Sequence, residues 1–422
     1  MTAAVDAPDL TDLTIGRVRR HMGSGRASLG EMLGRVVEVS SAGAWVTAAD
    51  GRRYLDFGGY GVFILGHRHP TVVAEVRRQL DQHPLATRVF LEPVSARAAE
   101  ALAEVAPDGL DQVHFVNSGT EATEAAIKLA RAHGRTELIA VDGGFHGKSM
   151  GALSIIGNPL YQRPFGPLLP GVTQVPFGDL PALRSALSAA AGRACLVLEP
   201  VLGEGGALPA PEGYLRGAAE ACREFGALLV ADEIQTGLGR LGRWWGMDAE
   251  AVVPDIMLVG KGLSGGVIPV AAMVTGAELY QPFGRDPFLH SSTFGASPIA
   301  SAAAIGALRA IKEEDAVAKA ASLGTRLLIL LHEAHRRHLP GQVAEVRGRG
   351  LLLGIEYAAA GLAGDVALEL MSRGVLVNHS LNAADVLRLT PPAILADPEV
   401  DFFAQVLDDA LAAVATRHQP RS

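Results

Sequence analysis

The sequence predicts an α/β protein built on a mostly parallel β-sheet with helices on both faces. From about residue 95, short apolar runs alternate with stretches of helical periodicity. Such alternation is typical of parallel strands that are buried on both faces. Several of these runs also end in glycines and polar residues. Because ligands bind at the carboxyl ends of the strands in such sheets, we expect the functional site there.

The first elements precede this alternating region. Residues 1–35 are mixed polar with scattered leucines and predict an N-terminal arm or a short helix. The runs 37–39, 44–46 and 54–57 alternate like strands, and Asp50-Gly51 predicts a hairpin turn before the third run. Apolar residues recur at helical spacing over 71–82, which predicts an amphipathic helix.

The alternating region supplies most of the predicted core, and at 422 residues the chain is long enough for more than one domain. The predicted strands are 113–116, 138–141, 196–198, 228–230, 256–259 and 270–274. The predicted helices are 95–105, 121–133, 179–191, 212–225 and 298–312.

Composition excludes several classes of function. The chain is 49% hydrophobic and 19% charged, as in ordinary globular proteins, and its net charge of −8 argues against a nucleic-acid partner. The first residues do not have the pattern of a signal peptide, and no apolar run is long enough to cross a bilayer. The two cysteines, Cys195 and Cys222, do not form a disulfide framework, so we expect a cytoplasmic protein without a membrane partner.

Lys261 is the strongest candidate for a catalytic side chain. It follows the apolar run 256–259 and has glycines on both sides. A desolvated lysine lowers its pKa and becomes a nucleophile that can bond an aldehyde such as that of pyridoxal phosphate. A lysine at a strand end can also simply reach solvent. The chain has five lysines, at 128, 148, 261, 312 and 319, and Lys261 is the one among apolar and glycine residues.

Two other strand ends could bind a cofactor. Asn117-Ser118-Gly119-Thr120-Glu121 leads into a helix, and a helix N-terminus with small residues can bind phosphate. Taken alone, the segment is better explained as a helix cap than as a phosphate site. Gly143-Gly144-Phe145-His146-Gly147-Lys148 places an aromatic ring among glycines, where it could stack on a planar cofactor or only pack in the core.

Carboxylates follow two further strands. Asp232 comes directly after the apolar run 228–230 and needs a positive partner, which a pyridinium nitrogen or an arginine could provide. Glu199 and Glu204 lie in a glycine-rich loop after 196–198, where solvation is the usual state of carboxylates.

Two patterns do not indicate function. Gly237-Leu238-Gly239-Arg240-Leu241-Gly242 matches a dinucleotide-binding pattern but does not open a helix. His332, His335 and His338 are interleaved with charged residues, so we expect a solvated helix face rather than a metal site, and we predict no metal.

Together these segments resemble the class III aminotransferases, which are pyridoxal-phosphate (PLP) enzymes of fold type I. The resemblance runs from about residue 54 to the C-terminus. It rests on the motifs Asn117–Ala122, Phe145-His146-Gly147, Asp232–Gly237, Gly260-Lys261-Gly262, Ser291–Gly295 and Arg388–Pro392. Within the class, the segments 66–70, 145–149 and 286–290 are most similar to putrescine aminotransferases, and next to ornithine and acetylornithine aminotransferases.

The resemblance implies a role for each motif residue. Lys261 would bind PLP covalently and move the substrate proton, and Asp232 would keep the pyridine nitrogen protonated. The other cofactor-binding residues would be Ser118, Gly119, Thr120, Phe145, His146, Gln235, Ser292 and Thr293. Thr293 resembles the residue that reaches the phosphate in the neighbouring subunit, which implies a homodimer with shared active sites.

The resemblance also implies the substrate-binding residues Tyr60, Lys148, Glu204 and Arg388. Arg388 would bind a carboxylate of glutamate or its keto acid, and Glu204 would pair with it when the substrate has no carboxylate there. Lys148 departs from the ornithine-type pattern, where an arginine is expected. This difference favours a primary amine or diamine as donor, with 2-oxoglutarate or pyruvate as acceptor.

Alternative reactions use the same cofactor residues. Ornithine, acetylornithine or 4-aminobutyrate could be the donor, or the enzyme could install an amine in a biosynthetic pathway. A PLP decarboxylase or aminomutase is a further alternative. The expected fold is a large PLP-binding domain over 71–300 with a seven-stranded sheet, and a smaller α+β domain over 301–422 with residues 1–70 packed against it.

Overall fold

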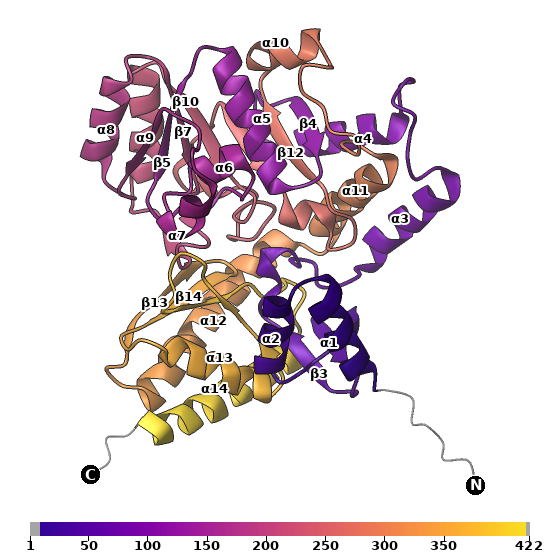
Figure 1. Ribbon diagram of the computed structural model, residues 1–422, viewed down its shortest axis with the longest axis vertical. Helices are drawn as coiled ribbons and strands as arrows, with labels where there is room; N and C mark the ends of the chain where they lie inside the picture. Colours follow the sequence, from indigo (N-terminus) through magenta and orange to yellow (C-terminus); the bar gives the residue numbers. More distant parts are fainter. Residues whose placement is uncertain (1–8, 419–422) are drawn as a thin grey trace.

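The computed structural model describes residues 9–418 (Figure 1). The upper half in Figure 1 holds the middle of the chain, and the lower half holds its first and last parts. Within this described range, no helix is both long and apolar enough to cross a membrane.

The central sheet has seven strands in the order β4-β12-β11-β10-β7-β5-β6. Strand β12 is antiparallel to both of its neighbours, and the remaining pairs in this order are parallel. The predicted α/β fold with a mostly parallel seven-stranded sheet is therefore confirmed. In chain order the strands are β4 Gln112–Val116, β5 Glu137–Val141, β6 Val172–Val175, β7 Ala194–Leu198, β10 Leu228–Asp232, β11 Ile256–Val259 and β12 Ala271–Thr275.

Strand β6 is the strand of this sheet that the apolar pattern does not predict. Its sequence is Val-Thr-Gln-Val, so it has no apolar run. It lies at the edge of the sheet beside β5 and has one buried residue, Val175. An edge strand needs less apolar surface than a central strand, and this explains why its pattern is weak.

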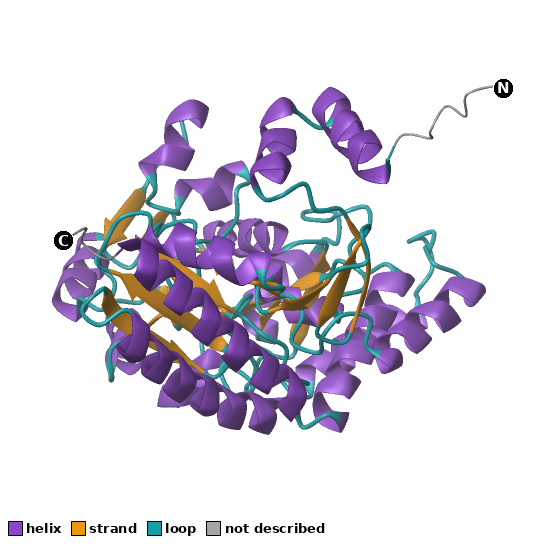
Figure 2. Cartoon of the chain, turned by 90° about the horizontal axis from the view of Figure 1, so that it is seen from below, coloured by secondary structure: helices purple, strands orange, loops and turns teal. Residues whose placement is uncertain are grey.

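Helices contribute to the cores on both faces of the central sheet, and Figure 2 shows the helices and strands of the chain from below. Successive strand residues point to opposite faces, so alternate residues of one strand enter different cores. In β11, Ile256 belongs to the core that contains α5 (Gly119–Ala132), and Met257 belongs to the core that contains α11 (Pro298–Glu313). Burial on both faces explains why these strands appear as continuous apolar runs. The other helices here are α3 Pro70–Gln82, α4 Pro93–Ala103, α6 Met150–Ser154, α7 Pro159–Gln162, α8 Leu180–Ala189, α9 Tyr214–Glu224 and α10 Ala277–Arg285.

The lower half contains two four-stranded sheets. One has the order β13-β14-β17-β16 and is antiparallel, and the other has the order β1-β2-β3-β15. The elements here are α1 Leu10–His21, α2 Ser24–Met32, β1 Glu38–Ala42, β2 Trp45–Ala48, β3 Arg53–Asp56, α12 Ala316–His338, β13 Val343–Arg349, β14 Leu352–Tyr357, α13 Leu362–Ser372, β15 Val375–Leu376, β16 Asn378–His379, β17 Val386–Leu389 and α14 Asp397–His418. A two-stranded ribbon, β8 Val201–Leu202 with β9 Leu208–Pro209, follows β7 in the chain.

The first strands are joined to the last third of the chain. Strand β3 pairs in parallel with β15, and the rings of Phe57 and Phe403 stack with centroids 4.1 Å apart. These contacts place the N-terminal strands next to the C-terminal elements. The domain boundaries at residues 70 and 300 stay a prediction.

The predicted solvated histidine face is wrong for His335. Its side chain is buried, Nδ1 bonds to the carbonyl oxygen of Leu331, and Nε2 bonds to the hydroxyl of Tyr357 at 2.9 Å. This face of α12 packs on β14, so it needs a polar side chain that can satisfy Tyr357. Sequence spacing does not show that contact.

Candidate active site

Lys261 lies at the carboxyl end of β11, where the chain enters a short 3-10 turn over Lys261–Ser264. Its backbone φ is +42°, a left-handed conformation that is unfavourable for a residue with a side chain. Backbone strain of this kind occurs repeatedly at active sites. The side chain is surrounded by protein and is partly exposed toward a cavity.

The pKa of Lys261 is lowered to about 8. Burial disfavours the ammonium form and has the largest effect. Glu204 raises the pKa, Arg388 lowers it, and the carboxylates Glu199 and Asp232 raise it. A neutral amine is therefore accessible close to physiological pH, as nucleophilic and proton-transfer chemistry require.

The cavity beside Lys261 has a volume of about 200 Å³ and lies where the predicted strand ends meet. Ends of β5, β7, β10 and β11 and the start of α5 contribute to its wall. The lining residues are Gly119, Thr120, Phe145, His146, Gly147, Glu199, Asp232, Ile234, Gln235 and Lys261. A second cavity of about 280 Å³ shares Gly119 and Lys261 and adds Asn117 and Ser118.

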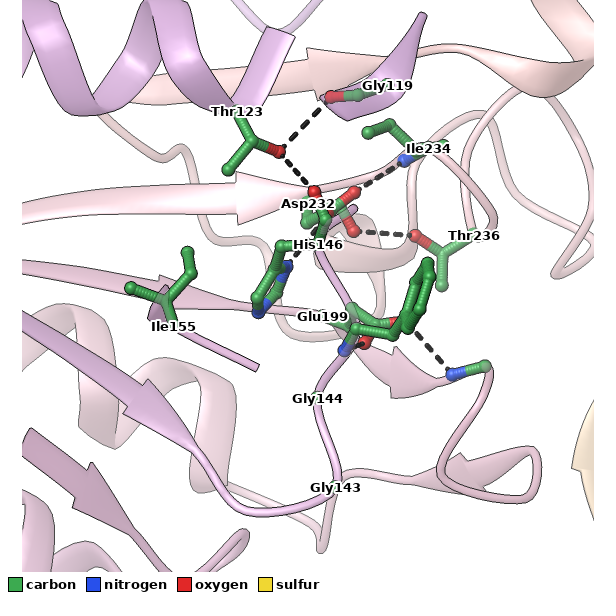
Figure 3. Close-up of polar contacts among 12 residues, drawn as sticks. Gly119, Thr123, Gly143, Gly144, His146, Ile155, Glu199, Asp232, Ile234 and Thr236 are labelled. Atoms are coloured by element: carbon green, nitrogen blue, oxygen red, sulfur yellow. Dashed lines mark hydrogen bonds and ion pairs between the residues drawn. The ribbon is translucent and has the colours of Figure 1, made fainter. Parts of the chain in front are cut away.

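Asp232 is paired with His146 inside this cavity. The distance between His146 Nδ1 and Asp232 Oδ2 is 2.7 Å, and Asp232 Oδ1 accepts the Ile234 N–H at 3.1 Å (Figure 3). Burial opposes the charged imidazole, but the hydrogen bond and charge of Asp232 outweigh it and raise the pKa of His146. The protein partner of this buried carboxylate is thus the imidazole of His146 and not an arginine.

The start of α5 has the features of an anion site. Ser118 is the N-cap, and its Oγ accepts the Glu121 N–H at 3.4 Å. The Thr120 hydroxyl bonds to the Ser149 hydroxyl at 2.6 Å. The first N–H groups of a helix have no acceptors within the helix, and they point toward an anion at its N-terminus.

Unpartnered buried atoms in the cavity fit PLP. Within residues 9–418, Gln235 Oε1, Gln235 Nε2 and His146 Nε2 are buried without a hydrogen-bond partner. Buried polar atoms without partners are costly, so their grouping at one cavity indicates a polar ligand. PLP has a phenolic oxygen, a pyridine nitrogen and a phosphate, which match the amide of Gln235, the carboxylate of Asp232 and the start of α5.

A second ion pair is formed by Glu204 and Arg388. The distance between Arg388 Nη1 and Glu204 Oε1 is 2.7 Å, and both side chains are buried. None of the three guanidinium nitrogens has an aligned hydrogen-bond partner in the described part of the chain. The other carboxylate oxygen of Glu204 accepts the Leu381 N–H at 3.0 Å. The pair thus joins the loop after β8 to β17 of a different sheet.

The remaining predicted residues lie outside the first cavity. Tyr60 is 61% exposed, and Lys148 is exposed, with its ammonium 4.0 Å from the ring centroid of Tyr161. Ser292 accepts a hydrogen bond from Asn117 Nδ2 at 2.7 Å, and Thr293 is exposed. These four residues are therefore not gathered with Lys261 in a single chain.

Glu199 is a charged residue of the cavity lining to which the sequence analysis assigns no role. Its side chain is 3% exposed, so the expectation of a solvated carboxylate is wrong. Glu204 is buried in the same way, at 4%. The sequence does contain a signal for this burial, since Glu199, like Asp232, is a carboxylate at the carboxyl end of a buried strand.

Comparisons with known proteins agree with this geometry. A family model described as "Aminotransferase class-III" matches residues 29–411. Ornithine aminotransferase from Toxoplasma gondii ME49 is 32% identical, with 97% of this chain and 96% of that chain covered and a TM-score of 0.88. A thermostable (S)-enantioselective omega-transaminase from Thermomicrobium roseum is 28% identical, with 97% and 100% covered and a TM-score of 0.88.

A third solved structure supports the fold alone. An aminotransferase from Bacillus anthracis is 24% identical, with 96% of this chain and 99% of that chain covered and a TM-score of 0.88. Enzymes of class III use PLP and have fold type I, in agreement with the sheet and the cavity. The chain is a member of the class III aminotransferases and is a PLP-dependent enzyme.

Proposed function

We propose that this aminotransferase takes an amino group from a primary amine or diamine of the putrescine type and transfers it to 2-oxoglutarate or pyruvate. The observation that supports this donor is the buried Glu204–Arg388 pair, whose charges act on Lys261. Such a pair lets one site accept two kinds of substrate. The donor has no carboxylate beside its reacting carbon, whereas the acceptor has one.

The pair is suited to exchange. A buried guanidinium without an anion is unfavourable, so Glu204 compensates the charge of Arg388 while an amine occupies the site. Because the contact lacks hydrogen-bond alignment, a substrate carboxylate that binds Arg388 through two parallel hydrogen bonds would be a better partner. Glu204 would then move away from Arg388 and release the Leu381 N–H.

Lys148 supports an amine rather than an amino-acid donor. Its ammonium lies 4.0 Å from the ring centroid of Tyr161 and 5.7 Å from that of Phe145. A lysine in this position presents a point charge, which is a poorer match for a carboxylate than the planar fork of an arginine. Tyr60 is exposed and would contact substrate at the entrance to the site.

The cavity residues divide the chemistry between them. When bound, PLP supplies an electron sink for the carbon that carries the amino group. Asp232, itself held by His146, would keep the proton on the ring nitrogen, and Gln235 would bond the phenolic oxygen. Phe145 would lie against the ring. Lys261 would hold the cofactor and, with a pKa near 8, take up and return the substrate proton.

The phosphate would be bound by Ser118, Gly119 and Thr120 at the start of α5, where N–H groups and the helix dipole favour an anion. Gly119 is close to another side chain, since a Cβ there would lie 2.7 Å from Ile234 Cδ1. A larger residue would therefore displace Ile234, which lines the cavity.

We also propose a homodimer in which Ser292 and Thr293 complete the phosphate site of the partner subunit. Thr293 is exposed, and its neighbours Phe288 and Phe294 are 88% and 57% exposed. Arg88 bonds to the carbonyl oxygen of Ser292, which brings the exposed apolar residues at 89–91 close to this segment. Exposed apolar surface of this kind is typical of interfaces.

Light scattering of the PLP-loaded enzyme during dilution tests the dimer, because separation of the subunits should release PLP. A monomer that keeps its PLP and its activity would contradict the shared site.

We also propose a cytoplasmic enzyme, since Cys195 and Cys222 are buried free thiols.

Ornithine is the second candidate donor, because two structures of an ornithine aminotransferase are 33% and 32% identical to this chain. Single-turnover absorbance of the PLP enzyme with each donor, in the absence of a keto acid, separates the two. We expect a faster change with putrescine than with ornithine. Faster conversion by ornithine, by N-acetylornithine or by 4-aminobutyrate would assign a different donor.

A further inference from the structure

Glu199 is a buried carboxylate that connects two loops of the site. It follows β7 directly, and its Oε1 accepts the Phe145 N–H at 2.9 Å. Its Oε2 accepts the Gly203 N–H at 3.0 Å. Phe145 belongs to the loop after β5, and Gly203 is adjacent to Glu204. One side chain thus connects the backbone of Phe145, beside the cavity, to the backbone that carries Glu204.

The packing around Gly203 leaves little freedom. A Cβ at Gly203 would lie 2.1 Å from Gln235 Oε1 and 3.4 Å from Glu199 Oε2. Gln235 and Glu199 therefore lie against the same peptide. Movement of this peptide would change the position of Glu204 and also disturb Gln235.

Charges from several elements surround Glu199. Burial raises its pKa to about 7, His146 lowers it, and Asp232 raises it. Glu199 is also one of the carboxylates that raise the pKa of Lys261. The carboxylate is therefore electrostatically linked to the catalytic groups as well as to the two loops.

We propose that Glu199 is a positioning residue that holds the Gly203–Glu204 peptide so that Glu204 can pair with Arg388 during the amine half-reaction. Both acceptor oxygens are required, because one fixes the peptide before Glu204 and the other fixes it relative to Phe145. This inference rests on the proposed exchange of partners at Arg388. The inference goes beyond that proposal by naming the residue that sets the geometry of the Glu204–Arg388 pair.

Glu233 provides a matched control. It is 1% exposed, its oxygens accept N–H groups from Gly246 and Met247, both at 2.9 Å, and burial raises its pKa to about 7. It does not belong to the lining of the cavity. Replacing Glu233 removes the same kind of interaction from the same kind of environment without touching the Glu204 loop.

The test compares Glu199→Gln with Glu233→Gln. Glutamine has one acceptor oxygen in place of two, so each variant leaves one buried N–H without its acceptor. The loss of such a hydrogen bond corresponds to a change on the order of 10-fold in an equilibrium or rate constant. We expect Glu199→Gln to slow the putrescine half-reaction by about 10-fold and to leave the 2-oxoglutarate half-reaction nearly unchanged. Glu233→Gln should lower the melting temperature of the apoenzyme without changing the ratio of the two half-reactions.

A structural readout is independent of activity. In crystals of the apo-variants, the distance between Glu204 Oε1 and Arg388 Nη1 should increase in Glu199→Gln and remain near 2.7 Å in Glu233→Gln. In a Glu204→Ala background, Glu199→Gln should cause no further selective loss, because the two residues act through one pair. Equal slowing of both half-reactions by Glu199→Gln, or an unchanged pair distance, would overturn the inference.

Failure of the proposed donor can be separated from failure of this inference. The same ratio is measured with ornithine, whose terminal amine carbon also has no carboxylate. If the wild-type enzyme uses ornithine and not putrescine, the diamine donor is wrong, and the ornithine data still test Glu199. If Glu204→Ala shows no selective effect with either donor, the exchange at Arg388 is wrong, and the inference is overturned with it.

Discussion

Two buried ion pairs contain residues whose charges act on Lys261, and the pairs differ in how they are held. Asp232 is the last residue of β10, His146 lies in the loop after β5, and their 2.7 Å contact is a hydrogen bond. Glu204 and Arg388 also lie 2.7 Å apart, but they come from different sheets and lack hydrogen-bond alignment. The two pairs thus have the same contact distance, but the first pair is fixed and the second is loosely held.

This difference between the two pairs explains how one cavity can keep its cofactor in place while its substrates change. Asp232 is held by hydrogen bonds with the His146 ring and with the Ile234 N–H. Arg388 is buried with unfilled hydrogen-bonding capacity, so an incoming carboxylate can form bonds that Glu204 does not. We therefore expect substitutions in the fixed pair to affect both half-reactions and substitutions in the loose pair to affect one.

The largest expected effect is at Lys261, whose pKa depends on Glu204, Arg388 and Asp232. Lys261→Ala should abolish covalent cofactor attachment and should reduce turnover by at least ~10²–10⁴-fold, because it also removes the proton-transfer group. Borohydride reduction followed by mass spectrometry measures the attachment, and steady-state assays measure the rate. A reducible cofactor bond and near-normal turnover in the variant would contradict the assignment.

The next prediction compares the pairs directly. Removing one partner of a buried ion pair costs about 3–5 kcal/mol. Glu204→Ala should slow the amine half-reaction more than the keto-acid half-reaction, and Arg388→Ala should do the opposite. Asp232→Asn is the control and should slow both halves alike. Single-turnover spectra of each half-reaction provide the ratios, and similar ratios in all three variants would show that the loose pair does not exchange partners.

The smallest expected effect concerns pH and the apoenzyme. The pKa of Lys261 is about 8 in the folded protein and 10.5 in its ordinary state. Between these values the unfolded chain binds more protons than the folded chain, so rising pH stabilises the fold. Relative to Lys261→Met, the wild-type apoenzyme should gain up to about 3 kcal/mol between pH 8 and 10.5.

Urea denaturation of both apoproteins at pH 7, 9 and 10.5 measures this gain. Below pH 8 the difference between the two proteins should not depend on pH. A difference that stays constant across the whole range would show that Lys261 keeps its ordinary pKa and that the surrounding charges compensate its burial.

The sequence predicts which residues line the cavity better than it predicts the contacts within the two ion pairs. Lys261, Asp232, Phe145 and Gly119 lie where the strand ends indicate, because parallel strands bring their carboxyl ends to one edge. The contact between His146 and Asp232 is not predicted, since it joins residues 86 positions apart through the side-chain geometry of the folded sheet. Burial of Glu199 is missed because a glycine-rich loop in isolation indicates solvent.

Some elements of the fold also cannot be predicted from the apolar and polar pattern of the sequence. Strand β6 has two polar residues in four and no apolar run, so pairing with β5 and not composition makes it a strand. The histidines of helix α12 have a sequence pattern that predicts a solvated face, but His335 bonds to the hydroxyl of Tyr357 in the folded protein. In both cases a partner distant in sequence decides the local environment.

The parallel pairing of β3 with β15 has a consequence for synthesis of the chain. Residues 53–56 leave the ribosome more than 300 positions before residues 375 and 376, so at about 5–20 residues per second β3 waits roughly 15–65 s for its neighbour. During that time the edge of β3 has unpaired N–H and C=O groups, and such edges pair with other chains. The nascent chain therefore has an open strand edge at β3 until β15 has been synthesised.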